Sequence, residues 1–216
     1  MDFLYSIVRF FVGGGPFMYP ILIVFAVGSA IAIERYITLT LIRRKNASMW
    51  RKLQPALADG DFEKARYLTS KDDSTVSQLL AMGLARQGAV HGLEEIEIAM
   101  EESMLEIIPK LEKRTAYVAL GASIATLLGL LGTIMGLIAA FTAVANANPA
   151  EKADLLSASI SVAMNTTAFG LMTAIPLLVT HSVLSAKTSE ILASLEMASV
   201  KALNIITGLA KRQVKV

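Results

Sequence analysis

The stretch SISVAMNTTAFGLMTAIPLL, residues 159–178, contains no charged residue, although hydroxyl and amide side chains recur along it. It belongs to a longer uncharged run between Asp154 and Lys187. As a helix this run would be about 45 Å long or more, whereas the hydrocarbon core of a bilayer is about 30 Å thick. We therefore predict a transmembrane helix at 156–186 that extends beyond the membrane.

The composition agrees with a membrane location. The 216 residues are 54% hydrophobic and 18% charged, and the mean hydropathy is +0.57, which is too apolar for an ordinary soluble domain. A net charge of +2 gives no indication of a nucleic-acid partner. The chain has no cysteine and only two histidines, His91 and His181, so we expect no metal site, no cofactor and no enzymatic activity.

Two further apolar runs complete the predicted fold. The first extends from Phe17 to Ile33, with two prolines at its start where a helix tolerates them, and the second lies between Arg114 and Glu151 without any charge. We predict an all-α integral membrane protein with three transmembrane helices, at 15–42, 115–146 and 156–186.

Lysine and arginine predict the orientation, because cytoplasmic flanks carry an excess of both. These residues are concentrated at 43–52, 110–114 and 187–215. We therefore expect a cytoplasmic helical region at 43–114, a cytoplasmic C-terminal helix at 187–216 and a periplasmic loop at 147–155. The N-terminus would lie outside, with residues 1–14 forming an amphipathic helix in the membrane interface or a frayed end.

The region 43–114 is predicted to be helical. Asp59-Gly60-Asp61 marks a turn with Asp61 as a helix N-cap. Residues 93–114 alternate acidic and apolar positions at helical spacing, and we expect them to run without a break into the second transmembrane helix, with a kink at Pro109. Their acidic face has two interpretations, a solvated surface or a docking site for a partner.

Small residues of the two long apolar runs predict close helix packing. Gly129, Gly132 and Gly136 follow at three- and four-residue steps, and Gly132–Gly136 is a GxxxG pair. In the third run Gly170 is a further packing candidate. Pro176 is expected to kink that helix.

Hydroxyl side chains form a stripe along the third run. Ser159, Thr166, Thr173 and Thr180 repeat every seven residues, with Asn165 and Thr167 beside them. Such hydroxyls often bond only to carbonyls of their own helix. The regular repeat also suits the lining of another helix or of a narrow water file, and Thr133 is the matching hydroxyl in the middle of the second helix.

Three motifs resemble a known family. GPFMYPILIVFAVGSAIAIER, LGLLGTIMGLIAAF and ISVAMNTTAFGLMTAIPLL are together similar to the MotA/TolQ/ExbB proton-channel family, and most similar to its ExbB/TolQ branch. The resemblance implies a pentamer in the bacterial inner membrane around ExbD/TolR-like single-span partners that supply a membrane Asp. It also implies proton-driven motion, passed on to an envelope protein such as a TonB-like one, and pathway roles for Thr133 and Thr167. On that interpretation Ser159, Asn165, Thr166 and Thr173 would line the same ion pathway.

One position departs from the family. Many ExbB and TolQ members have a Glu eight residues before the motif glycine, and the corresponding residue here is Val162. Flagellar stator subunits of the MotA type also lack that Glu, so ion coupling remains compatible with the sequence.

The sequence is compatible with several functions. The sequence favours an ion-conducting, proton-driven motor subunit for TonB-type import or Tol-type function. A non-conducting scaffold for single-span partners and a motility or gliding stator remain alternatives. A solute transporter is disfavoured because inverted repeats and paired broken helices are missing from the sequence.

Overall fold

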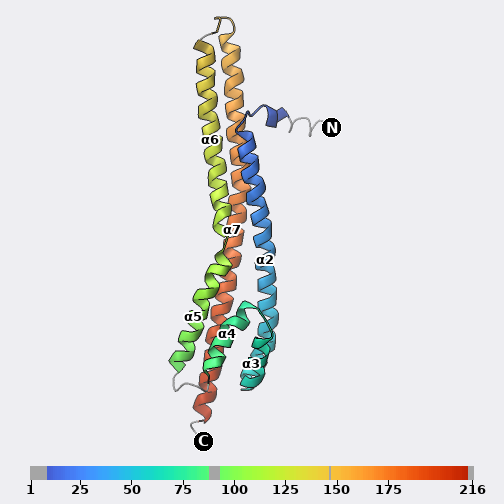
Figure 1. The fold of residues 1–216 in the computed structure, drawn as a ribbon, viewed down its shortest axis with the longest axis vertical. Helices are drawn as coiled ribbons and strands as arrows, with labels where there is room; N and C mark the ends of the chain where they lie inside the picture. The colour runs from blue at the N-terminus through green and yellow to red at the C-terminus, as the bar shows by residue number, and fades with distance from the viewer. Residues whose placement is uncertain (1–8, 88–92, 146, 214–216) are drawn as a thin grey trace. The chain divides into compact units, whose positions relative to one another are not determined.

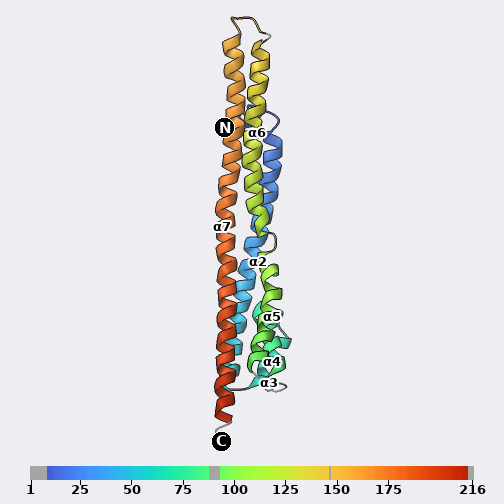
Figure 2. The ribbon, with the colours of Figure 1, turned by 90° about the vertical axis from the view of Figure 1, so that its left-hand side faces the viewer.

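The structure, a computed structural model, describes residues 9–87, 93–145 and 147–213. Most of the predicted interfacial helix at 1–14 therefore lies outside the described residues, although residues 9–12 are helical. The remaining helices are α2 (Met18–Ala58), α3 (Phe62–Ser70), α4 (Thr75–Arg86), α5 (Leu93–Glu112), α6 (Thr115–Ala145) and α7 (Lys152–Gln213). Figures 1 and 2 show this all-helical chain.

Among the described residues, three segments are long and apolar enough to cross a membrane. They lie in α2, in Glu94–Ala145, which contains α6, and in α7. The predicted all-α fold with three membrane-spanning helices is thus confirmed. The chain divides into two compact units, the first formed by 1–34 with 114–183 and the second by 35–113 with 184–216.

The first unit packs the start of α2, all of α6 and the first part of α7. Pro16 precedes α2 and Pro20 lies in its first turn, where proline costs no helical hydrogen bond. Gly28 of α2 faces Leu177 of α7, whose side chain would lie 3.0 Å from an added Cβ. Small residues therefore allow the helices of this unit to approach closely.

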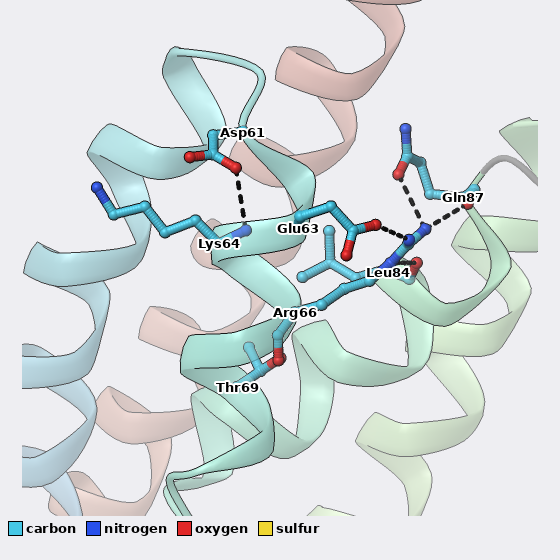
Figure 3. Close-up of polar contacts among 7 residues, drawn as sticks. All are labelled: Asp61, Glu63, Lys64, Arg66, Thr69, Leu84 and Gln87. Carbon is cyan, nitrogen blue, oxygen red and sulfur yellow. Dashed lines mark hydrogen bonds and ion pairs between the residues drawn. The ribbon is translucent and has the colours of Figure 1, made fainter.

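The second unit contains the short helices α3 and α4. Asp61 caps α3 as predicted, since its carboxylate accepts a hydrogen bond from the backbone N–H of Lys64 at 3.0 Å. Arg66 of α3 caps the C-terminal end of α4, because it donates to the carbonyl oxygens of Leu84 at 3.0 Å and Gln87 at 2.7 Å. Figure 3 shows this arginine lying between the two helices.

A buried amide joins α4 to α2 in the same unit. Asn46 is only 4% exposed. Its Nδ2 donates to the Thr75 hydroxyl at 2.6 Å, and its Oδ1 accepts from the backbone N–H of Val76 at 3.3 Å. One polar side chain thus satisfies N-terminal groups of α4 that the helix itself leaves without partners.

The predicted continuous helix from 93 into the second transmembrane segment is wrong. α5 ends at Glu112 and α6 begins at Thr115, because Arg114 adopts a φ of 65°, a left-handed conformation that a continuing α-helix excludes. The break thus falls at Arg114, five residues beyond Pro109, which lies inside α5. By contrast, the predicted third transmembrane helix and the described part of the predicted C-terminal helix, 187–213, form one helix, since α7 continues through Pro176 to Gln213.

Candidate functional site

The candidate site lies where α6 and α7 make backbone contact. A Cβ added at Gly170 would lie 2.8 Å from the carbonyl oxygen of Ala125 and 3.0 Å from the Cα of Gly129. Further along α6, Gly132 faces the side chain of Thr166, and a Cβ added at Gly136 would lie 2.9 Å from that of Ala163. The structure thus places Gly129, Gly132 and Gly136 of α6 and Gly170 of α7 at the contact between these two helices.

Two threonines meet beside this contact. The hydroxyls of Thr133 on α6 and Thr167 on α7 are hydrogen-bonded to each other. Thr167 also donates to the carbonyl of Gly129 at 3.1 Å, and Thr133 lies 3.3 Å from the same carbonyl and 3.3 Å from that of Ala163. Because both side chains are only half-buried, the pair lies at the surface of the first unit.

This pair can bind but cannot titrate. A hydroxyl has one rotatable O–H donor and also accepts hydrogen bonds, so by turning from their present carbonyl acceptors the two threonines can donate to water or to an ionised carboxylate brought to them. No charged residue occurs between Thr115 and Ala150. Within the described ranges there is also no group of three or more His, Asp or Glu side chains that could hold a metal.

Thr166 and Asn165 have different partners. The Thr166 hydroxyl is 1% exposed and donates to the carbonyl of Gly14, while Asn165 Nδ2 donates to that of Gly13 at 3.4 Å. The two side chains thus hold the backbone that precedes α2 against α7. The structure uses them for packing within the chain.

The remaining stripe residues are spread along α7. Thr173 is buried, Ser159 is half-buried, and the Thr180 hydroxyl bonds to the Pro176 carbonyl of its own helix at 2.8 Å. Pro176 itself is exposed. The seven-residue stripe therefore contains packed and self-bonded hydroxyls, and the surface hydroxyl pair lies beside it.

The sequence reasoning missed two contributors to this region. Gly13 and Gly14 supply the carbonyl oxygens to which α7 donates. Their signal was the GGGP sequence at 13–16, which marks an irregular backbone with exposed carbonyls ahead of a helix. Val162 lies nearby, 37% exposed, where its methyl would be 3.1 Å from a Cβ at Gly15.

Comparison with known proteins supports the resemblance. A family model described as the MotA/TolQ/ExbB proton channel family matches residues 71–197. The Tol-Pal system protein TolQ of Haemophilus influenzae is 34% identical over 93 residues, which cover 43% of this chain. The match spans 40% of the length of that curated relative.

The family match covers more than half of the chain. It begins just before α4 and includes α5, α6 and most of α7. The TolQ match favours the ExbB/TolQ branch. With three helices able to cross a membrane, these findings identify a multi-pass protein of the bacterial inner membrane. The chain belongs to the MotA/TolQ/ExbB proton channel family.

Proposed function

We propose that this protein is the ion-conducting subunit of an inner-membrane motor complex, with the proton as the transported ion. The complex would use the proton motive force to energise an envelope process of the TonB-dependent or Tol type. The observation that carries the proposal is the surface hydroxyl pair Thr133–Thr167. It provides a polar site within the uncharged stretches of α6 and α7, which lie between Arg114 and Glu151 and between Asp154 and Lys187.

The pair requires an acid from another chain. We propose that a single-span ExbD/TolR-like partner supplies a membrane Asp, and that several copies of this protein, a pentamer by the family resemblance, surround it. Against the apolar surface of α6 and α7 a bare carboxylate is costly, so the Asp would be neutral there. Next to Thr133 and Thr167 it would accept hydrogen bonds and ionise. Movement between these two settings would couple proton passage to motion.

The test replaces both hydroxyls by isosteric methyl groups, with Thr133→Val and Thr167→Val combined. The protein is purified with the single-span partner that accompanies it, reconstituted in liposomes, and assayed for proton flux with a pH-sensitive dye under an imposed potential. We expect flux to fall by at least about tenfold, the effect of losing about 1.4 kcal/mol of stabilisation of the ionised state.

A matched control is available on the same helix. The Thr126 hydroxyl is exposed and bonds to the Ala122 carbonyl of its own helix at 3.1 Å, so Thr126→Val should conduct like the unmodified protein. Normal flux in the double variant would refute the pathway role of the pair.

Val162 favours a second candidate function, a non-conducting scaffold. A Glu at this position would be the carboxylate expected for ExbB and TolQ members, and its replacement by an apolar side chain removes a possible ion ligand. A scaffold would hold the partner without any proton flux in the unmodified complex. The same flux assay therefore separates the two functions, and a motility stator would be distinguished by the identity of the copurified partner.

A further inference from the structure

One side of α5 is acidic and partly apolar, and nothing in the proposed pathway uses it. We define the acidic face as Glu94, Ile98, Glu101 and Leu105. These residues lie on the side of the helix opposite its buried residues, and the apolar members are strongly exposed, Ile98 at 52% and Leu105 at 71%. Isolated exposed apolar residues are common, but two that lie seven residues apart on one face, between carboxylates, form a stripe suited to another helix.

The same unit carries a complementary stripe on α2. We define the basic face as Leu41, Arg44, Ser48 and Arg51, all exposed. It lies opposite the side of α2 that buries Asn46, Met49 and Leu53. The two arginines are seven residues apart, as are Glu94 and Glu101, so both stripes repeat their charges at the same rise of about 10.5 Å.

The charges of both faces are available for a partner. Among the ion pairs of the described residues, none involves a member of either face. Arg43, on another side of α2, shows the contrast, since it pairs with Glu190 of α7 at 2.6 Å. Arg51 Nε donates to the Ala47 carbonyl of its own helix at 3.3 Å, which does not neutralise its charge. The two faces thus have opposite charges that none of the ion pairs above uses.

A buried arginine sets the relative heights of the two stripes. Arg35 of α2 is 4% exposed and donates to the carbonyl of Leu111 near the end of α5. Within the second unit α2 and α5 run in opposite directions (Figures 1 and 2). Arg44 lies nine residues after Arg35, and Glu102 lies nine residues before Leu111. Because the two helices are antiparallel, Arg44 and Glu102 lie at about the same height.

The same count places Arg51 level with Glu95. The positive charges of α2 therefore lie at the heights of the negative charges of α5, about 13 and 24 Å from the Arg35–Leu111 contact. Copies of a membrane protein that are related by rotation about the membrane normal keep every residue at its height. Such a rotation would place Arg44 within one residue, about 1.5 Å, of the level of Glu101 in a neighbouring copy, and Arg51 within the same distance of the level of Glu94.

From this match in charge, spacing and height we propose that the acidic face of one copy docks on the basic face of a second copy. The contact joins two different surfaces, so it repeats around a closed ring. Ile98 and Leu105 would cover the aliphatic parts of the arginine side chains. The proposal concerns assembly alone and stands whether or not the protein conducts protons.

Crosslinking tests the contact directly, because the chain has no cysteine of its own. The variant that combines Arg51→Cys with Glu94→Cys is treated in native membranes with a short bifunctional maleimide. We expect a ladder of covalent oligomers beyond the dimer on a denaturing gel. Each single-cysteine variant should remain monomeric, because the two faces differ.

A matched control keeps the faces and changes the height. Glu112 is exposed and lies seven residues beyond Leu105 on the same side of α5, so Arg51→Cys with Glu112→Cys places the thiols about 25 Å apart in height. This variant should lose the ladder. The proposal would be overturned if both double variants gave equal ladders. It would also be overturned if Arg51→Cys with Glu94→Cys gave no ladder.

Charge reversal tests the electrostatics without a crosslinker. Arg51→Glu and Glu94→Arg should each weaken oligomerisation about two- to fivefold, the range for an exposed ion pair, and the two together should restore it. Lys64→Glu, at an exposed site of α3, should have no effect. If Arg51→Glu leaves the oligomer unchanged but lowers binding to vesicles rich in phosphatidylglycerol, the basic face serves anionic lipid and the proposal fails.

Discussion

At the scale of single residues, the contact between α6 and α7 depends on the absence of side chains. The atoms nearest to a Cβ at Gly170 belong to the backbone of α6. Backbone atoms cannot rotate away as the end of a flexible side chain can. The helices would have to separate to admit even one methyl group, and the contacts beside the Thr133–Thr167 pair would open.

We therefore predict that Gly170→Ala destabilises the protein by about 1–3 kcal/mol, the usual cost of overpacking. The measurement is thermal unfolding of the purified protein in detergent. Gly208→Ala on the same helix is the control, because a Cβ there has no neighbour within 4 Å. That change should stabilise α7 slightly, by about 0.5–1 kcal/mol. Equal stability of the two variants would contradict the close contact.

At the scale of the elements, one acidic side chain organises the turn between α3 and α4. The Asp72 carboxylate accepts from the backbone N–H of Ser74 at 2.8 Å and from the Ser77 hydroxyl at 3.1 Å. Hydrogen bonding by the Ser74 side chain is the main reason why the pKa of Asp72 lies below its ordinary value, and it outweighs the opposing effect of burial.

This lowered pKa gives a pH dependence of definite sign. The ionised form stabilises the fold above the unfolded pKa of about 3.9, and this contribution is lost as the pH falls through the lower folded pKa. Asp72→Asn should therefore be less stable than the unmodified protein at pH 7, with the difference shrinking below about pH 4. Trp50 is the single tryptophan and lies in the second unit, so its fluorescence reports unfolding there.

Asp73→Asn provides the control for that experiment. Asp73 is adjacent and exposed, so its substitution should leave the acid dependence in place. A constant difference between Asp72→Asn and the unmodified protein from pH 7 to strongly acidic pH would contradict the role of the Asp72 charge.

Some of these elements could be predicted from the sequence and others could not. Apolar length identified the three spanning helices, and Asp59-Gly60-Asp61 identified a turn, because both signals are local. The break at Arg114 was missed because no Gly or Pro marks it. The seven-residue repeat selected Thr166 and Thr173, which the structure buries, whereas Thr167 lies one position, or about 100°, further around the helix. The stripe itself left Thr167 to one side, and the family resemblance singled it out together with Thr133.

At the scale of the whole molecule, the placement of positive charge predicts the orientation in the membrane. The Lys- and Arg-rich regions at 43–52 and 187–215 should be cytoplasmic, and the loop between α6 and α7 should face the periplasm.

Cysteine labelling would measure the orientation, again because the chain has no native cysteine. Asn148 and Lys64 are both exposed. In spheroplasts a membrane-impermeant maleimide should label Asn148→Cys and not Lys64→Cys, and in inside-out vesicles the pattern should reverse. The opposite result would invert the predicted topology.

The glycine contact also limits how this protein can move. If α6 or α7 turned about its own axis, a bulky residue would replace Gly129 or Gly170 and collide with the opposite backbone. Within the first unit, α6 and α7 therefore cannot rotate against each other and must move together as one rigid pair. The spacing between Thr133 and Thr167 then stays constant. On the proposed mechanism, the hydroxyl pair of this subunit would be a stationary binding site. The movement that the motor transmits would be that of the partner helix whose carboxylate passes this site.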